Sequence, residues 1–167
     1  MGPAGHLAMG FAAKPTAPKA PLWVLLVATE VLDLLNFGFV VIGIEKVSLD
    51  LTDFLQGNID LSVPWSHGLV MTVMWSVLAS LIVFLVYHER RTAGVVGLLV
   101  FSHWVLDFIV HPPDLPLLPA GSTMVGLGLW TSRPGVIISF ILEFVLLAGG
   151  IAIYWSKRKQ ATESRNG

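Results

Sequence analysis

Four long apolar stretches constrain the fold of this 167-residue chain more than any other feature of its sequence. A hydrocarbon core of about 30 Å is crossed by a helix of roughly 20 predominantly apolar residues. Four stretches reach that length, and they cover about residues 22–44, 68–87, 92–111 and 134–155. The hydrophobic share of 54% and the charged share of 13% are typical of a membrane protein. We therefore expect one all-α transmembrane domain over residues 1–167, built as a bundle of four transmembrane helices.

Basic residues near the ends of the spans predict the orientation of the bundle. Arg90 and Arg91 lie between the second and third spans, and residues 157–159, KRK, follow the fourth. Lys14 and Lys19 precede the first span. Cytoplasmic loops carry an excess of lysine and arginine, so all three groups are expected on the cytoplasmic side. An even number of spans then predicts that both termini are cytoplasmic.

Ionisable side chains inside the apolar stretches are the candidates for a functional site. The third span contains His103, Asp107 and His111 at steps of four residues, which places them on one side of a helix. The first span contains Glu30 and Asp33, which are three residues apart and share a face. An aspartate near the centre of a span costs about 2.5 to 3.5 kcal/mol of insertion free energy, whereas each large aliphatic residue contributes only roughly 0.3 to 0.6 kcal/mol. Such groups persist where they face one another, a cavity or an ion.

Several polar residues have simpler interpretations. Glu143, near the middle of the fourth span, is explained equally well by a hydrogen bond to a neighbouring helix, so we leave it outside the site. His111 has an equally plausible role at the end of its helix. The acidic first outer loop, which includes Glu45, is typical of a solvated surface. No glycine-rich phosphate loop and no basic, aromatic pattern for nucleic acid is present, so nucleic acid is not an expected partner.

Imidazoles and carboxylates that converge from three spans fit a divalent metal ion. The chain has no cysteine, so any metal must be bound by nitrogen and oxygen. Zn²⁺ suits these ligands best, with Mn²⁺ and Fe²⁺ as alternatives. A bound cation also compensates several buried carboxylates and lowers the pKa of a coordinated water. No short signature such as HExxH is present, so the spacing alone is a moderately specific signal for a metal site.

Several short motifs resemble those of a known family. They are Gly5-His6-Leu7, Asp33 in the first span, Ser66-His67-Gly68, Ser102-His103 followed by Asp107, and Leu115-Pro116-Leu117-Leu118-Pro119. In order and spacing the chain resembles the YdjM-type family of bacterial inner-membrane proteins, described as membrane-bound metal-dependent hydrolases. The resemblance implies a location in the bacterial inner membrane. It also implies a metal site made of His6, Asp33, His67, His103 and Asp107.

The chain departs from the family pattern at two points. The acidic motif lacks a second aspartate two residues after Asp33, and the segment around His67 keeps only one histidine. Glu30 is a candidate substitute for the missing carboxylate, and one ion is easier to support than two. His6 reaches the site only if residues 4–13, AGHLAMGFAA, re-enter the membrane, for which this short segment is sufficiently small and apolar.

These observations favour a metal-dependent hydrolase in which an activated water attacks an ester or phosphoester, with a lipid among the substrates. Glu30 or His111 is the expected general base. The expected partners are membrane lipid and a lipid or small-molecule substrate, and a homo-oligomer is left open. One alternative is transport of protons or a divalent cation along the acids and histidines. Another is a noncatalytic scaffold in which polar residues hold helices together by hydrogen bonds of about 1 kcal/mol each.

Overall fold

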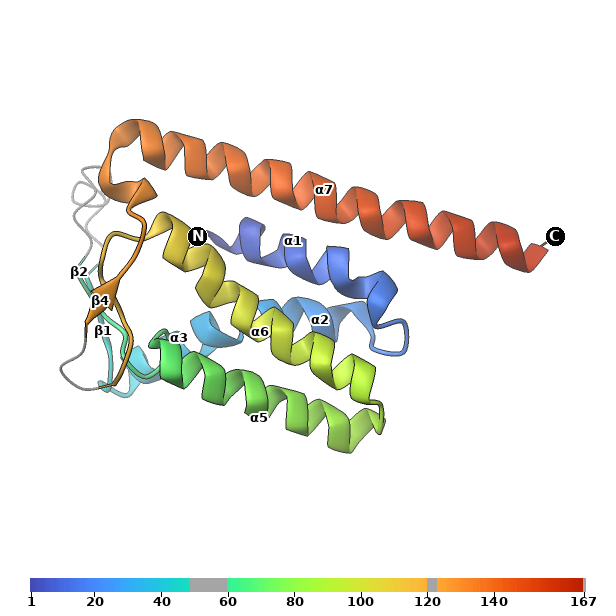
Figure 1. Ribbon diagram of the computed structural model, residues 1–167, viewed down its shortest axis with the longest axis horizontal. Helices are drawn as coiled ribbons and strands as arrows, with labels where there is room; N and C mark the ends of the chain where they lie inside the picture. Colours follow the sequence, from blue (N-terminus) through green and yellow to red (C-terminus); the bar gives the residue numbers. More distant parts are fainter. Residues whose placement is uncertain (49–59, 120–122, 167) are drawn as a thin grey trace.

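Three long helices form the frame of the molecule. The computed structural model describes residues 1–48, 60–119 and 123–166. Helices α5 (Leu69–Tyr87), α6 (Arg90–Val110) and α7 (Arg133–Asn166) are each long and apolar enough to cross a membrane. They run alongside one another, and α7 projects beyond the rest (Figure 1). The prediction of a largely helical membrane protein is confirmed, and α7 continues past residue 155, where the fourth span was predicted to end.

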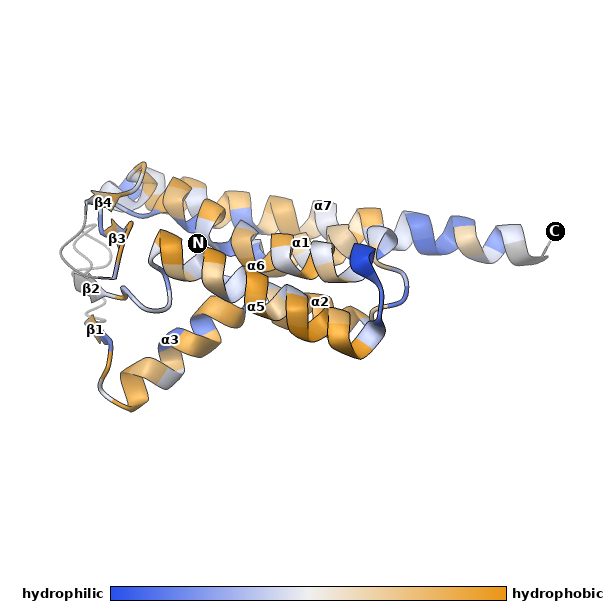
Figure 2. Ribbon diagram, turned by 60° about the horizontal axis from the view of Figure 1, so that its bottom comes forward, coloured by the Kyte–Doolittle hydropathy of each residue, from blue (hydrophilic) through white to orange (hydrophobic). Residues whose placement is uncertain are grey.

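The first predicted span is not one continuous helix. Helix α2 (Leu22–Thr29) and helix α3 (Val31–Val41) are bent by 56° relative to each other. The break is at Glu30, whose backbone angles of φ −106° and ψ 4° depart from helical values. Figure 2 shows α3 leaning away from the other helices. The prediction of an unbroken helix over residues 22–44 is therefore wrong, and the described residues hold four spans only if the bent pair counts as one.

The residues ahead of α2 form a helix that is packed inside the bundle. Helix α1 (Pro3–Ala13) runs beside α7 and contacts α2 and α6 (Figure 1). A short helix, η1 (Lys14–Thr16), begins the turn that leads back into α2. Close approach of α1 to α7 requires Gly150, because a Cβ there would lie 2.3 Å from the carbonyl oxygen of Ala8. This packing buries His6 inside the molecule, as the prediction of an inward-folded N-terminal segment requires.

The two ends of the bundle differ in character. At one end, strand β1 (Lys46–Ser48) pairs with β2 (Asp60–Ser62), and β3 (Leu115–Pro116) pairs with β4 (Met124–Val125), both antiparallel. The short helix η2 (Leu129–Thr131) follows β4 and leads into α7. At the other end lie the turn between α1 and α2, the turn between α5 and α6, and the hydrophilic part of α7 (Figures 1 and 2). The predicted basic groups thus gather at the end opposite the hairpins, as expected if that end is cytoplasmic.

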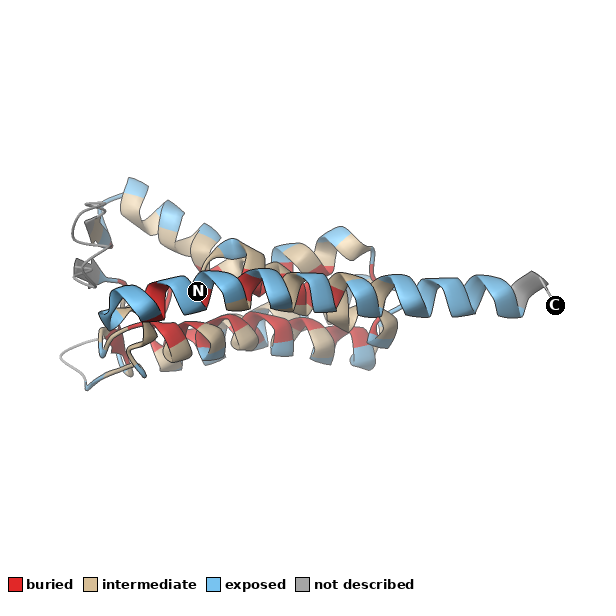
Figure 3. Cartoon of the chain, turned by 90° about the horizontal axis from the view of Figure 1, so that it is seen from above, coloured by how far each residue is buried: buried red, intermediate tan, exposed pale blue. Residues whose placement is uncertain are grey.

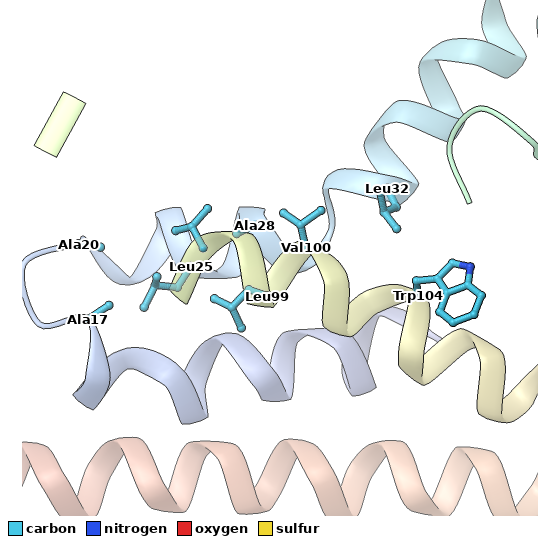
Figure 4. Packing of buried hydrophobic residues seen from close by; sticks show 9 residues of the cluster. Ala17, Ala20, Leu25, Ala28, Leu32, Leu99, Val100 and Trp104 are labelled. Atoms are coloured by element: carbon cyan, nitrogen blue, oxygen red, sulfur yellow. The ribbon is translucent and has the colours of Figure 1, made fainter. Parts of the chain in front are cut away.

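Small and aliphatic side chains make up the apolar core between α2 and α6. Buried positions lie on the facing sides of the helices, while the outer part of α7 is exposed (Figure 3). Small residues at such contacts allow helix backbones to approach closely, which is the usual mode of packing in membranes. The core residues are Ala17, Ala20, Leu25, Ala28, Leu32, Val96, Leu99, Val100 and Trp104 (Figure 4).

We predict that Gly150→Ala destabilises the fold whereas Gly149→Ala does not. A methyl group at Gly150 meets the backbone of Ala8, so the free energy of unfolding should fall by about 1 to 3 kcal/mol. A methyl group at Gly149 meets nothing within 4 Å and should leave stability equal or raise it by up to about 1 kcal/mol. Thermal unfolding in detergent, followed by circular dichroism, measures both. Equal loss of stability in the two variants would contradict the packing of α1 on α7.

Candidate metal centre

Five ionisable residues meet at the hairpin side of the apolar core. His6 comes from α1, Asp33 from α3, His67 from the segment that leads into α5, and His103 and Asp107 from α6. The side chain of Asp33 is 45% exposed, and the other four residues are buried. The structure therefore brings together all five residues that the sequence named as metal ligands.

Asp33 and Asp107 each lie close to the two histidines His67 and His103. The Nε2 atoms of His67 and His103 lie 3.3 Å apart. Oδ1 of Asp33 lies 3.4 Å from the first nitrogen and 3.5 Å from the second. Oδ2 of Asp107 lies 3.6 Å and 3.2 Å from the same two atoms. Ligand atoms bound at 2.0 to 2.1 Å around a tetrahedral ion are themselves about 3.3 Å apart, so His67, His103 and Asp107 are spaced to bind one ion together, with Asp33 beside the two histidines.

The orientation of His103 depends on the break between α2 and α3. Its Nδ1 atom lies 2.6 Å from the carbonyl oxygen of Thr29, the last residue of α2. A carbonyl oxygen can only accept, so Nδ1 of His103 carries a hydrogen, and in the neutral ring Nε2 presents a lone pair to the cluster. The bend at Glu30 thus accompanies two features of the site: the Thr29 carbonyl that orients His103, and the start of α3, which carries Asp33.

A buried chain of hydrogen bonds orients His67. Nδ1 of His67 lies 2.8 Å from the hydroxyl of Ser66, and that hydroxyl donates to Oε2 of Glu45 at 2.7 Å. Since a hydroxyl has one hydrogen, His67 must donate to Ser66, which leaves Nε2 of His67 with its lone pair free for the cluster. Glu45 also accepts from the backbone amides of Trp65 and Ser66 and from the side chain of Asn36. The prediction that Glu45 is solvated is wrong, because its exposed fraction is 2%.

The resulting cluster consists of acceptors that face one another. In neutral rings protonated at Nδ1, both Nε2 atoms are acceptors, like the two carboxylates, of which Asp107 also accepts from the backbone nitrogen of Met1. Such a group can hold a cation. A proton bridges one pair of these atoms, whereas a divalent ion accepts from all of them and balances both carboxylates.

His6 borders the cluster from α1. Its ring stacks on His103 with centroids 3.6 Å apart, and its Nε2 atom lies 2.9 Å from the carbonyl oxygen of Met1 and 3.3 Å from Oδ1 of Asp107. The backbone nitrogen of Met1 also donates to that carboxylate oxygen. Nδ1 of His6 is buried without a partner in the described part of the chain. His6, Asp33 and His103 together offer a second set of ligand atoms within 4.8 Å, which shares His103 with the first set.

Glu143 holds the start of α1 in place. Its carboxylate accepts from the backbone amide of Gly2 at 2.6 Å and is buried between α7 and α1. This is the neighbouring-helix partner that we expected of a single intramembrane acid. Glu143 thus lies outside the cluster but fixes the helix that carries His6.

A cavity of about 170 Å³ adjoins the cluster on the hairpin side. Asp33, His67 and Asp107 line it, and so do Asn36, Trp130 and His111. Side chains of both hairpin regions complete its wall, among them Val47, Val63 and Leu115. The cluster is therefore open to a small molecule on this side.

His111 is paired with a carboxylate that the sequence pattern did not single out. Nδ1 of His111 lies 3.1 Å from Oδ1 of Asp114, and the ring packs against Trp130 with centroids 4.7 Å apart. The two prolines between His111 and Asp114 were a usable signal, because they stiffen the turn that joins the pair. Glu30, the other predicted general base, accepts from the Thr29 hydroxyl at 3.4 Å and is not among the residues that line the cavity.

We predict that Glu45→Ala destabilises the fold far more than Glu163→Ala. Removing the Glu45 carboxylate leaves the buried donors of Trp65 and Ser66 unpaired, at a cost of about 1 to 3 kcal/mol for each. Glu163 is exposed and pairs only with Lys159 at 3.9 Å, so its loss should change stability by less than about 0.5 kcal/mol. Chemical denaturation of the two detergent-solubilised variants tests this. Similar denaturation midpoints for the two variants would show that the hydrogen bonds of Glu45 do not hold the segment around Trp65 and Ser66 in place.

No family model matches the chain, and neither a curated protein nor a solved structure matches it. The resemblance to the YdjM-type family therefore stays a prediction. What the site can do follows from its own residues.

Proposed function

We propose that this chain is a membrane-embedded, metal-dependent hydrolase that cleaves an ester or a phosphoester. The observation that carries the proposal is the convergence of His67, His103, Asp33 and Asp107 as acceptors beside a cavity. Their chemistry fits Zn²⁺, with Mn²⁺ and Fe²⁺ as alternatives. A location in the bacterial inner membrane, which the family resemblance implies, belongs to the same proposal.

The burial of the ligands favours a catalytic over a purely structural ion. Structural zinc sites are closed by four protein ligands, whereas catalytic sites use three and keep one position open. Here His67, His103 and Asp107 are buried, while Asp33 is half-exposed and lines the cavity. When bound, a divalent ion supplies a Lewis acid and lowers the pKa of water. The side of the cluster that holds Asp33 is the side from which substrate reaches it.

His111 is the better of the two candidate general bases. It lines the cavity beside the cluster, whereas Glu30 does not. Asp114 holds Nδ1 of His111, which leaves Nε2 as the nitrogen that takes a proton. A carboxylate that orients a histidine in this way is a recurring feature of general-base catalysis.

The cavity limits which part of a substrate enters. At about 170 Å³ it is smaller than the 300 to 1,000 Å³ typical of drug-sized ligand sites, so it takes an ester or phosphoester group rather than an acyl chain. It lies toward the hairpins, at the end of the bundle opposite the basic residues. A lipid substrate would thus place its headgroup in the cavity and leave its chains in the bilayer.

The placement of the apolar core argues against a transport pathway. Leu25, Ala28, Leu99 and Val100 are buried between the cluster and the basic end of the bundle. The cavity beside the cluster lies toward the hairpins, and the described core between α2 and α6 on the other side is apolar. A proton relay needs ionisable groups on both sides.

Purified protein should contain metal that depends on the cluster. We expect near-stoichiometric zinc, manganese or iron in the parent, and its loss in His103→Ala and in Asp107→Asn, because each removes a buried ligand. Elemental analysis of folded, detergent-purified protein measures this. His88→Asn is the matched control, since His88 lies in the turn between α5 and α6 and asparagine tolerates its positive φ. A parent that stays metal-free after reconstitution with all three ions would overturn the metal site.

Replacing His111 should separate catalysis from metal binding. His111→Gln should keep its metal yet hydrolyse an activated ester or phosphodiester about 10² to 10⁴ times more slowly than the parent, because the general base is gone. The hydrolysis rates of the metal-loaded parent and of metal-loaded His111→Gln are measured by the release of p-nitrophenol from the activated substrate. His88→Asn is again the control. A His111→Gln variant as fast as the parent would remove His111 from the mechanism. Metal-loaded parent protein with no activity on either substrate class would contradict the hydrolase proposal while leaving the metal site intact.

A further inference from the structure

A second, larger groove lies between α5 and α6 on the outside of the bundle. Its volume is about 680 Å³, and none of the cluster residues lines it. Its walls are mostly apolar, and they include Val77, Leu81 and Phe84 of α5 and Leu98 and Phe101 of α6. Arg90, the first residue of α6, is the one lining residue with a full charge.

Two glycines of α6 shape this groove. A Cβ at Gly97 would lie 3.1 Å from the carbonyl oxygen of Ser76, so the two helices touch there. A Cβ at Gly94, one turn nearer to Arg90, would meet nothing within 4 Å. The groove therefore has free space over Gly94, and at Gly97 it ends where α5 and α6 are in contact.

The length of the groove matches one leaflet of a bilayer. Eleven residues separate Arg90 from Phe101, which is about 16 Å along a helix. Half of a hydrocarbon core is about 15 Å. An acyl chain that starts at the level of Arg90 therefore reaches the middle of the membrane at the far end of the groove.

Arg90 forms no ion pair with any residue that the structure describes. The carboxylate of neighbouring Glu89 lies 3.4 Å from Lys19 and accepts from the hydroxyl of Thr92. A guanidinium at this level is suited to a phosphate, which it can bind through two parallel hydrogen bonds.

We propose that this groove binds one anionic phospholipid of the leaflet at the basic end of the bundle. Arg90 binds the lipid phosphate, and one acyl chain lies over Gly94 between α5 and α6. The site is separate from the cluster and independent of the proposed hydrolase activity. A bound lipid here fills the space between the two helices and anchors α6, which carries His103 and Asp107 farther along.

Native mass spectrometry of the detergent-solubilised protein, titrated with phosphatidylglycerol or with phosphatidylcholine, tests the proposal. The parent should bind one phosphatidylglycerol in preference to phosphatidylcholine. Arg90→Gln should weaken this binding roughly tenfold, as expected for one charge-assisted hydrogen-bonding group. Arg91→Gln changes the adjacent arginine, which does not line the groove, and should stay within about twofold of the parent.

A second variant tests the acyl-chain part of the groove. Gly94→Leu adds a side chain at a position where a Cβ meets nothing within 4 Å, so the variant should fold and yet weaken phosphatidylglycerol binding. Circular dichroism verifies folding of all variants. Equal binding of the two lipids, equal loss in Arg90→Gln and Arg91→Gln, or unchanged binding in Gly94→Leu would each overturn the proposal. So would a dimer of this chain that excludes lipid from the groove.

Discussion

The arrangement of the site depends on two histidine nitrogens that face each other at 3.3 Å with lone pairs directed inward. Each histidine ring is held in this orientation by a hydrogen bond at its Nδ1 atom. The Thr29 carbonyl holds His103, and this carbonyl is available where α2 ends at the Glu30 break. The hydroxyl of Ser66, itself bonded to Glu45, holds His67. The bent first span and the buried loop acid therefore have one explanation: both orient ligands toward the same point.

The same arrangement has a consequence for stability. An ion bound among these residues stabilises the folded state by its binding free energy. It also offsets the cost of an aspartate inside an apolar span, about 2.5 to 3.5 kcal/mol on the insertion scale. Asp107 in α6 and Asp33 in α3 both lie within 3.6 Å of His67 and so belong to this cluster.

Periodicity and family resemblance predicted the helices and the five converging residues, but not the partners that orient them. Spacing of four along one helix was sufficient to pair His103 with Asp107, because both lie on α6. Glu45 was missed because its contact with Ser66 crosses a loop, and no helical period relates the two residues. The bend at Glu30 was missed because an apolar run indicates that a segment can cross a membrane but does not indicate where its helix breaks. The burial of His6 depends on Gly150, far away in the sequence.

X-ray absorption spectroscopy of the zinc-loaded protein tests the central claim most directly. We expect four or five nitrogen and oxygen neighbours at 2.0 to 2.1 Å, no sulfur, and outer-shell scattering from two imidazole rings. A spectrum with six oxygen neighbours and no imidazole would show an ion bound elsewhere on the protein. That result would contradict the assignment of His67 and His103 as ligands. It would also leave the break at Glu30 and the burial of Glu45 without a role in orienting those ligands.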